Sequence, residues 1–148
     1  TLNSLGLLAV RIKKTDEKMW NEGFSIYRNR LNKVAIFMAK NNAMLLFGTD
    51  TPAMNMVTNP PGYNGFLEIK HWYAAGIGLE QIFKALTFNN SKLFNLRDYY
   101  GSVEKGKIAN LLILNDNPLN NIDAYNKIEN VIIRGRIISR KDLSAENN

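Results

Sequence analysis

The carboxylate best suited to chemistry in this sequence is Asp50, which follows a short apolar run. Residues 44–47 are four consecutive apolar residues bounded by Asn41-Asn42 and Gly48, a pattern typical of a strand buried on both faces of a parallel sheet. Parallel α/β folds carry their catalytic groups at the carboxyl ends of such strands. Asp50 is therefore a candidate catalytic residue, although a carboxylate in this position can also simply hydrogen-bond its own turn.

Few other residues offer metal or nucleophilic chemistry. The chain has no cysteine, which excludes disulfides, thiolate nucleophiles and zinc sites of the cysteine type. Its one histidine, His71, stands between Lys70 and Trp72 on a predicted helix. We expect a surface or packing role for His71.

Length and charge limit the possible folds and partners. At 148 residues, with 45% hydrophobic residues, the chain can bury a core, but it is far shorter than the roughly 250 residues of a complete eight-stranded α/β barrel. Its net charge is +6, yet the basic residues are scattered and form no run longer than two, so nucleic acid is not an expected partner. No apolar run reaches the ~20 residues of a membrane span. We expect a soluble protein of the cytoplasm or periplasm.

A long helix is predicted before the apolar run. Thr15 is a good N-cap, and Asp16 and Glu17 add negative charge to the first turn, where the helix dipole favours it. An apolar stripe with steps of three and four residues follows, which predicts about seven turns packed against a sheet. Its members are Trp20, Phe24, Tyr27, Leu31, Val34 and Met38. A partner-binding face is the alternative interpretation of this stripe.

Beyond Asp50, the pattern predicts an irregular loop and then shorter helices. Residues 51–64 contain Pro52, Pro60 and Pro61, so this loop is long enough to form one wall of a site. Helices are predicted over residues 66–75 and 79–88, with a further turn over 91–94.

The character of the sequence changes near residue 99. Residues 101–107 have the glycine spacing of a tight turn between short strands, and residues 109–114 read as a buried strand. Residues 128–133 and 136–139 predict a hairpin that turns at Arg134-Gly135. We therefore expect two units, residues 1–97 and residues 98–148, the second a mostly antiparallel β layer with apolar contacts chiefly from Leu112, Leu114, Val131 and Ile133.

Three segments in this order resemble the C-terminal part of the metal-dependent amidohydrolase superfamily, closest to its imidazolonepropionase-like and prolidase-like members. They are LLFGTDTP at residues 45–52, AGI at 75–77 with ALTFN at 85–89, and GSVEKGKIANLLIL at 101–114. The resemblance covers about residues 16–140. It implies the C-terminal part of a distorted (β/α)8 TIM-type barrel, followed by strands of a small β-sandwich that is built from both chain ends.

The resemblance also implies a chemistry. Members hold one or two divalent metals, zinc being the expected one here, at the carboxyl ends of the barrel strands, and they hydrolyse C–N bonds of small amide, cyclic amide or dipeptide substrates. Asp50 matches the aspartate after the last barrel strand, which implies that it is both a metal ligand and the general base. Gly106 and Lys107 are then expected to be structural.

The departures from the family pattern are equally informative. The His-x-His pair, the bridging Lys or Glu and two further histidines of the family have no counterpart here, and Asn110 stands where the family usually has Asp. Because a catalytic zinc takes three protein ligands and a water, Asp50 alone cannot hold one. We expect the chain alone to bind no stoichiometric metal, to self-associate and to leave amides intact. The missing N-terminal barrel portion would come from the same or a second chain.

Two non-catalytic alternatives stay open. One is a stand-alone α/β binding module that grips a partner with the proline-rich loop at residues 51–64. The other is an assembly module that docks through the helix stripe from Trp20 to Met38. Homo-oligomer formation also stays open.

Overall fold

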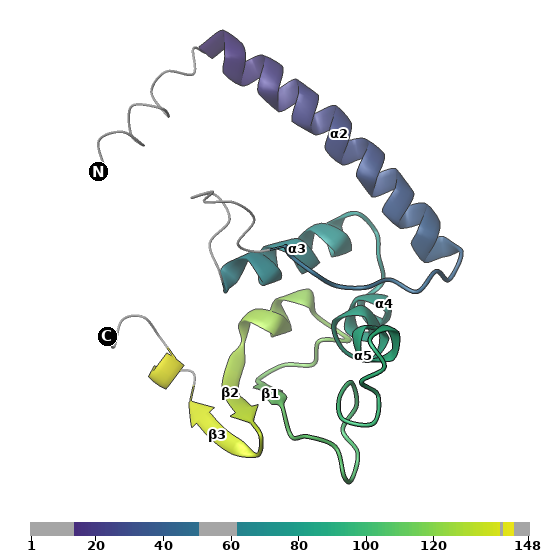
Figure 1. Ribbon diagram of the computed structural model, residues 1–148. Helices are drawn as coiled ribbons and strands as arrows, with labels where there is room; N and C mark the ends of the chain where they lie inside the picture. The colour runs from purple at the N-terminus through teal and green to yellow at the C-terminus, as the bar shows by residue number, and fades with distance from the viewer. Residues whose placement is uncertain (1–13, 51–61, 140, 144–148) are drawn as a thin grey trace.

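The computed structural model describes residues 14–50, 62–139 and 141–143 (Figure 1). Helices occupy the first two thirds of the chain and a small sheet the last third. The elements are α2 (Lys14–Lys40), α3 (Tyr63–Ala74), α4 (Leu79–Lys84), the π-helix η1 (Ala85–Asn89), α5 (Asn90–Leu93), β1 (Leu111–Leu114), the 3₁₀ helix η2 (Ile122–Asn126), β2 (Ile128–Ile133), β3 (Arg136–Ser139) and the 3₁₀ helix η3 (Lys141–Leu143). Among the described residues, no helix combines the length and hydropathy that crossing a bilayer would require.

The predicted long helix is confirmed as α2, which ends directly before Asn41-Asn42. Its end has the hydrogen bonds of a Schellman motif, because the N–H of Ala43 donates to the Met38 carbonyl at 2.9 Å and the N–H of Asn42 to that of Ala39 at 3.2 Å. Asn42 has the left-handed conformation of this motif, with φ of 56°. The predicted N-cap was wrong, because the helix already begins at Lys14 and Thr15 lies within its first turn.

The apolar stripe of α2 does not pack as predicted. Leu31, Val34 and Met38 are 51%, 56% and 41% exposed, and α2 runs outward from the other helices (Figure 1). The buried Ala39 and the partly buried Ala35 make the contact with the core instead. The small side chains of Ala35 and Ala39 let the end of the helix approach the core closely.

The segment after α2 is not a strand, so the prediction of a strand over residues 44–47 was wrong. Leu45 is buried and Phe47 half-buried, whereas Met44 and Leu46 are 43% and 36% exposed. Such alternation is typical of an extended segment with one packed face. A strand also needs a hydrogen-bonded neighbour, and the described strands β1, β2 and β3 pair only with one another.

The helices after the loop follow the prediction with shifted boundaries. Most of the predicted loop, residues 51–61, lies outside the described residues, and α3 begins at Tyr63 rather than at residue 66. The predicted helix over 79–88 is confirmed, but it continues from α4 into the π-helix η1 and then into α5, which is the predicted further turn. The first part was predictable because Leu79 and Ile82 have helical spacing.

The antiparallel sheet has the order β1-β2-β3. The predicted hairpin is confirmed: Ile133 pairs with Arg136, and both turn residues have positive φ, 49° at Arg134 and 79° at Gly135. β1 pairs with β2 and begins at Leu111, two residues later than predicted.

The strand β1 is less buried than the sequence predicted. Leu112 is 53% exposed and Ile113 40%, and on the partner strand Ile133 is 46% exposed. Of the apolar contacts expected in this layer, Leu114 and Val131 are partly buried. Leu112 and Ile113 are consecutive and point to opposite faces, so the described residues leave both faces of β1 partly open.

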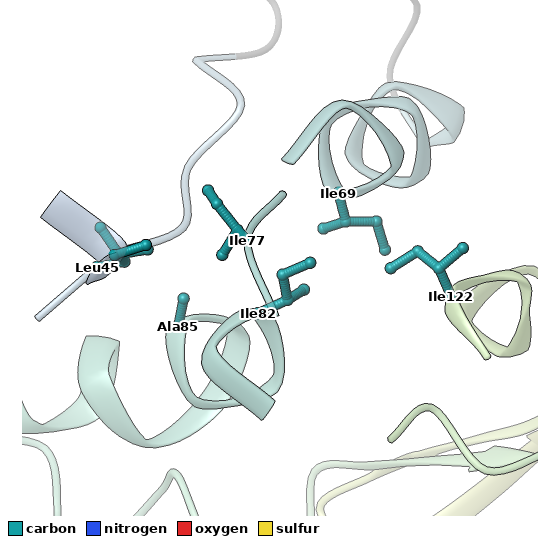
Figure 2. Close-up of a cluster of buried hydrophobic side chains, with 7 residues drawn as sticks. Leu45, Ile69, Ile77, Ile82, Ala85 and Ile122 are labelled. Atoms are coloured by element: carbon teal, nitrogen blue, oxygen red, sulfur yellow. The ribbon is translucent and has the colours of Figure 1, made fainter. Parts of the chain in front are cut away.

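The core lies among the helices and includes a residue from the C-terminal third. Figure 2 shows buried side chains converging from the segment after α2, from α3, from the turn before α4, from α4 and η1, and from η2. They include Leu45, Ile69, Ile77, Ile82, Ala85 and Ile122. Ile82 and Ala85 are fully buried. The connection between β1 and β2 therefore contains a helix, η2, that helps to close this core.

Candidate functional site

Asp50 stands at the end of the extended segment that follows α2. Its side chain is exposed, and its φ of 51° lies in the left-handed region. Few residues other than glycine adopt this conformation, and Asp is among the more tolerant ones. Backbone strain of this kind is concentrated at functional sites, where the surrounding structure maintains it.

Two side-chain amides hold the segment that leads to Asp50. The N–H of Phe47 donates to Asn90 Oδ1 at 3.2 Å, and Asn90 Nδ2 donates back to the Phe47 carbonyl at 2.9 Å. Asn89 Nδ2 donates to the Leu45 carbonyl at 2.9 Å. All three hydrogen bonds are partly buried, so losing one would leave a backbone group without a partner at a cost of roughly 1–3 kcal/mol. We call Asn89 and Asn90 the amide clamp.

The side chain of Phe47 is held as well as its backbone. Its ring meets that of Trp72 edge-on, with centroids 5.8 Å apart and an angle of 68° between the planes. Trp72 is in turn oriented by a 2.8 Å hydrogen bond from Nε1 to Glu68 Oε1. A Cβ at Gly65 would lie 4.0 Å from this Phe47 ring and 3.8 Å from Thr49, so the first turn of α3 lies against the segment. Phe47 is thus fixed between α3 and α5.

A third amide fixes the other end of the segment. Gln81 Nε2 on α4 donates to the Ala39 carbonyl near the end of α2 at 2.8 Å. Gln81, Asn89 and Asn90 were not predicted as site residues. One available signal was the Asn89-Asn90 pair itself, because asparagine is a poor helix former that competes for backbone hydrogen bonds.

The other residues singled out from the sequence have roles separate from that of Asp50. His71 is exposed on α3, in agreement with the surface role expected for it. Asn110 accepts a 2.8 Å hydrogen bond at Oδ1 from the N–H of Arg134, so it anchors the hairpin turn. An amide oxygen accepts this bond as a carboxylate would, which explains why asparagine can stand there.

The predicted structural turn is held by a small polar network. Lys107 Nζ donates to Ser102 Oγ and lies 3.3 Å from Glu104 Oε1, and Ser102 donates to Glu104. The Lys107 side chain is only 15% exposed. Hydrogen bonds from Ser102 and Lys107 lower the pKa of the Glu104 carboxyl.

The described residues do not make a metal site by themselves. Residues 14–50, 62–139 and 141–143 contain no group of three or more His, Asp or Glu side chains close enough to hold one ion. The exposed Asp50 carboxylate is an oxygen donor suited to a divalent metal, so this residue fits as one ligand of a larger set. The other ligands would have to come from residues outside the described part.

The chain is similar to solved structures over most of its length. Two solved structures match with a TM-score of 0.61 and 22% identity: a Xaa-Pro dipeptidase with methionine bound in its active site, and molinate hydrolase. The matches cover 73% and 70% of this chain but only 25% of each of the other chains, and they identify this chain as part of an α/β fold of TIM-barrel type. A comparison with curated proteins gave no significant match. The model of the amidohydrolase family matches residues 13–138, and since this is most of the chain, the protein belongs to that family.

Proposed function

We propose that this chain forms the C-terminal part of a metal-dependent amidohydrolase that hydrolyses C–N bonds. The observation that carries the proposal is Asp50, an exposed carboxylate in a left-handed backbone conformation, at the end of a segment clamped to the helices. In a chain of this family, such a carboxylate suits a role as metal ligand and general base. Its exposed side chain can be reached by substrate and by ligands from the rest of the enzyme.

The chemistry needs a base with a fixed position. A bound divalent metal, one or two zinc ions in our proposal, lowers the pKa of its water toward neutrality. Asp50 accepts the proton of the attacking water and later delivers it to the leaving amine nitrogen, so one carboxylate serves both halves of the reaction. General acid–base catalysis of this kind contributes roughly 10²–10⁴-fold to rate.

The proposed substrate is a small molecule with an amide, cyclic amide or dipeptide bond. The Xaa-Pro dipeptidase among the similar structures makes an Xaa-Pro dipeptide the first substrate to test. Imidazolonepropionase-like cyclic amides form the second class, on the strength of the sequence resemblance.

We further propose how the chain is divided and what it works with. Residues 1–97 would complete a TIM-type barrel, and residues 98–148 would belong to a composite β-sandwich. The other portion of the barrel, on the same or a second polypeptide, would supply the histidines that this sequence lacks. The short coverage of the similar structures, 25% of each, supports this arrangement.

The decisive test is Asp50→Asn in the complete polypeptide that contains this chain. We expect kcat for alanyl-proline to fall on the order of 10²–10⁴-fold, because asparagine cannot accept the proton. Metal content, measured by mass spectrometry of the purified protein, should fall as well. Asp98→Asn, at another exposed carboxylate, is the matched control and should leave both values unchanged. Unchanged turnover in Asp50→Asn would refute the assignment.

One observation favours a second candidate, an assembly module that docks through the α2 stripe. Leu31 and Val34 are more than half exposed, and Phe37, beside the stripe, is 68% exposed. If assembly is the function, Leu31→Glu with Val34→Glu should dissociate the native complex in analytical ultracentrifugation, while Asp50→Asn changes nothing measurable.

A further inference from the structure

We infer that Asn89 and Asn90, the amide clamp, are positioning residues that set the place of the Asp50 carboxylate in the active site. The inference rests on the proposed function of Asp50. Neither asparagine touches the reacting atoms in this scheme. They act by fixing the backbone from which Asp50 projects.

The clamp reproduces the hydrogen bonds of a neighbouring strand. In a hydrogen-bonded antiparallel pair, two residues exchange both of their N–H···O bonds. The Asn90 side chain does the same with Phe47, accepting from its N–H and donating to its carbonyl. The Asn89 side chain donates a hydrogen bond to the carbonyl of Leu45, two residues before Phe47. In an extended chain the carbonyls of residues two apart point to the same side, so both asparagines bind the same edge of the segment.

An amide side chain is well suited to the Asn90 pair of bonds. Its oxygen is an acceptor and its nitrogen a donor, whereas an ionised carboxylate only accepts. In Asn90→Asp the second carboxylate oxygen would face the Phe47 carbonyl in place of the 2.9 Å donor. This change keeps size and shape but replaces one attraction with a repulsion.

The clamp is close enough to Asp50 along the chain to affect where Asp50 lies. Two residues, Gly48 and Thr49, separate Phe47 from Asp50, so the span is about 10 Å at most. With the Phe47 ring held by Trp72, the clamp fixes the chain three residues before Asp50. Misplacement of a catalytic group by about 1 Å can cost on the order of 10²-fold in rate.

The helix that carries the clamp is irregular where the clamp begins. The π-helix η1 ends at Asn89, and α5 begins at Asn90. π-helical turns are rare and occur frequently at functional sites. Here the irregular turn presents two consecutive side chains to the same extended segment.

The test compares two Asn→Asp substitutions in the complete polypeptide. Asn90→Asp removes the donor to Phe47, whereas Asn110→Asp, the matched control, keeps the acceptor that holds Arg134. Two readouts are taken: amide hydrogen exchange of peptides covering residues 43–50, and kcat and KM for alanyl-proline. We expect Asn90→Asp to speed exchange at residues 43–50 at least tenfold and to lower kcat by about 10–100-fold, with KM nearly unchanged. The control should change neither readout.

The outcomes separate this inference from the proposed function. Unchanged exchange in Asn90→Asp would show that the clamp does not hold the segment and would overturn the inference. Faster exchange with unchanged kcat, while Asp50→Asn is inactive, would also overturn it and would leave the proposed function intact. If Asp50→Asn is fully active, the proposed function fails, and the positioning role fails with it even where exchange responds.

Discussion

Gly101 and Ser91 lie so close together that Gly101→Ala should be one of the most damaging small changes in the chain. A Cβ at Gly101 would overlap Ser91 Oγ, lie 2.8 Å from Ser91 Cβ and lie 3.3 Å from the Cα of Phe88. Ser91 is itself buried, and its hydroxyl donates to the Phe88 carbonyl at 2.8 Å. Neither side can yield without breaking a contact.

The cost of Gly101→Ala has two parts. Its φ of +94° disfavours any residue with a Cβ, by about 1–2 kcal/mol. Overpacking against Ser91 adds roughly 1–3 kcal/mol. The expected loss of about 2–5 kcal/mol is a large fraction of the typical 5–15 kcal/mol stability of a folded protein.

Gly106 provides a matched control for the backbone part. Its φ is +93°, and a Cβ there would meet nothing within 4 Å, so Gly106→Ala should cost only about 1–2 kcal/mol. We would follow hydrogen exchange of peptides covering residues 85–105 through a urea series, so that the transition reports this region. The midpoint should shift further for Gly101→Ala than for Gly106→Ala.

A double substitution isolates the contact itself. Ser91→Gly removes both the Oγ and the Cβ that a new methyl group would meet, so the added cost of Gly101→Ala should shrink to about that of Gly106→Ala in this background. Equal midpoint shifts for Gly101→Ala and Gly106→Ala in the wild-type background would refute the close packing.

Two further predictions concern ionisable groups. Hydrogen bonds from the N–H of Asn117, from Lys127 and from Asn121 lower the pKa of Asp116. The contribution of ionised Asp116 to stability is therefore present above the usual pKa of about 3.9 and is lost as pH falls through the lowered pKa. An NMR titration of Asp116 should show the lower pKa, and an unshifted titration would contradict the prediction. Burial raises the pKa of Tyr125 to about 12, so stability should fall as pH rises from about 10 to 12. The buried Tyr125 hydroxyl has no hydrogen-bond partner among the described residues, so Tyr125→Phe should leave the free energy of unfolding unchanged or raise it by up to roughly 1 kcal/mol. Urea unfolding of this variant should no longer show the loss of stability at alkaline pH. A loss of stability above about 1 kcal/mol would contradict the absence of a partner.

Local signals predicted the elements whose geometry is itself local. The hairpin from Ile128 to Ser139 follows from alternating residues around Arg134-Gly135, whose backbone adopts the positive φ that a tight turn needs. The end of α2 was equally predictable, because Asn42 can adopt the left-handed conformation that stops a helix.

The segment before Asp50 could not be predicted in the same way. An apolar run such as residues 44–47 indicates burial, but whether it becomes a strand depends on which neighbour satisfies its backbone. Here the described partners are side-chain amides from α5 and η1, more than 40 residues further along the chain. No periodicity in the sequence encodes such a contact, so the hydrogen bonds that hold the segment before Asp50 were not predictable from the sequence.

The prediction that the apolar stripe of α2 is buried was wrong for a related reason. The stripe containing Leu31 and Val34 identifies an apolar face, but the pattern does not say what covers it. The structure shows that the helix meets the core through Ala35 and Ala39 instead.

The presence of Ile122 in the helical core has a consequence for synthesis on the ribosome. Ile69, Ile82 and Ala85 leave the ribosome well before Ile122, which lies among them in the finished core (Figure 2). At roughly 5–20 residues per second, the interval between Ala85 and Ile122 lasts on the order of 2 to 7 seconds. During that time the apolar side chains that Ile122 later covers are exposed on the nascent helices. A ribosome-associated chaperone would therefore bind the segment that contains Ile69, Ile82 and Ala85.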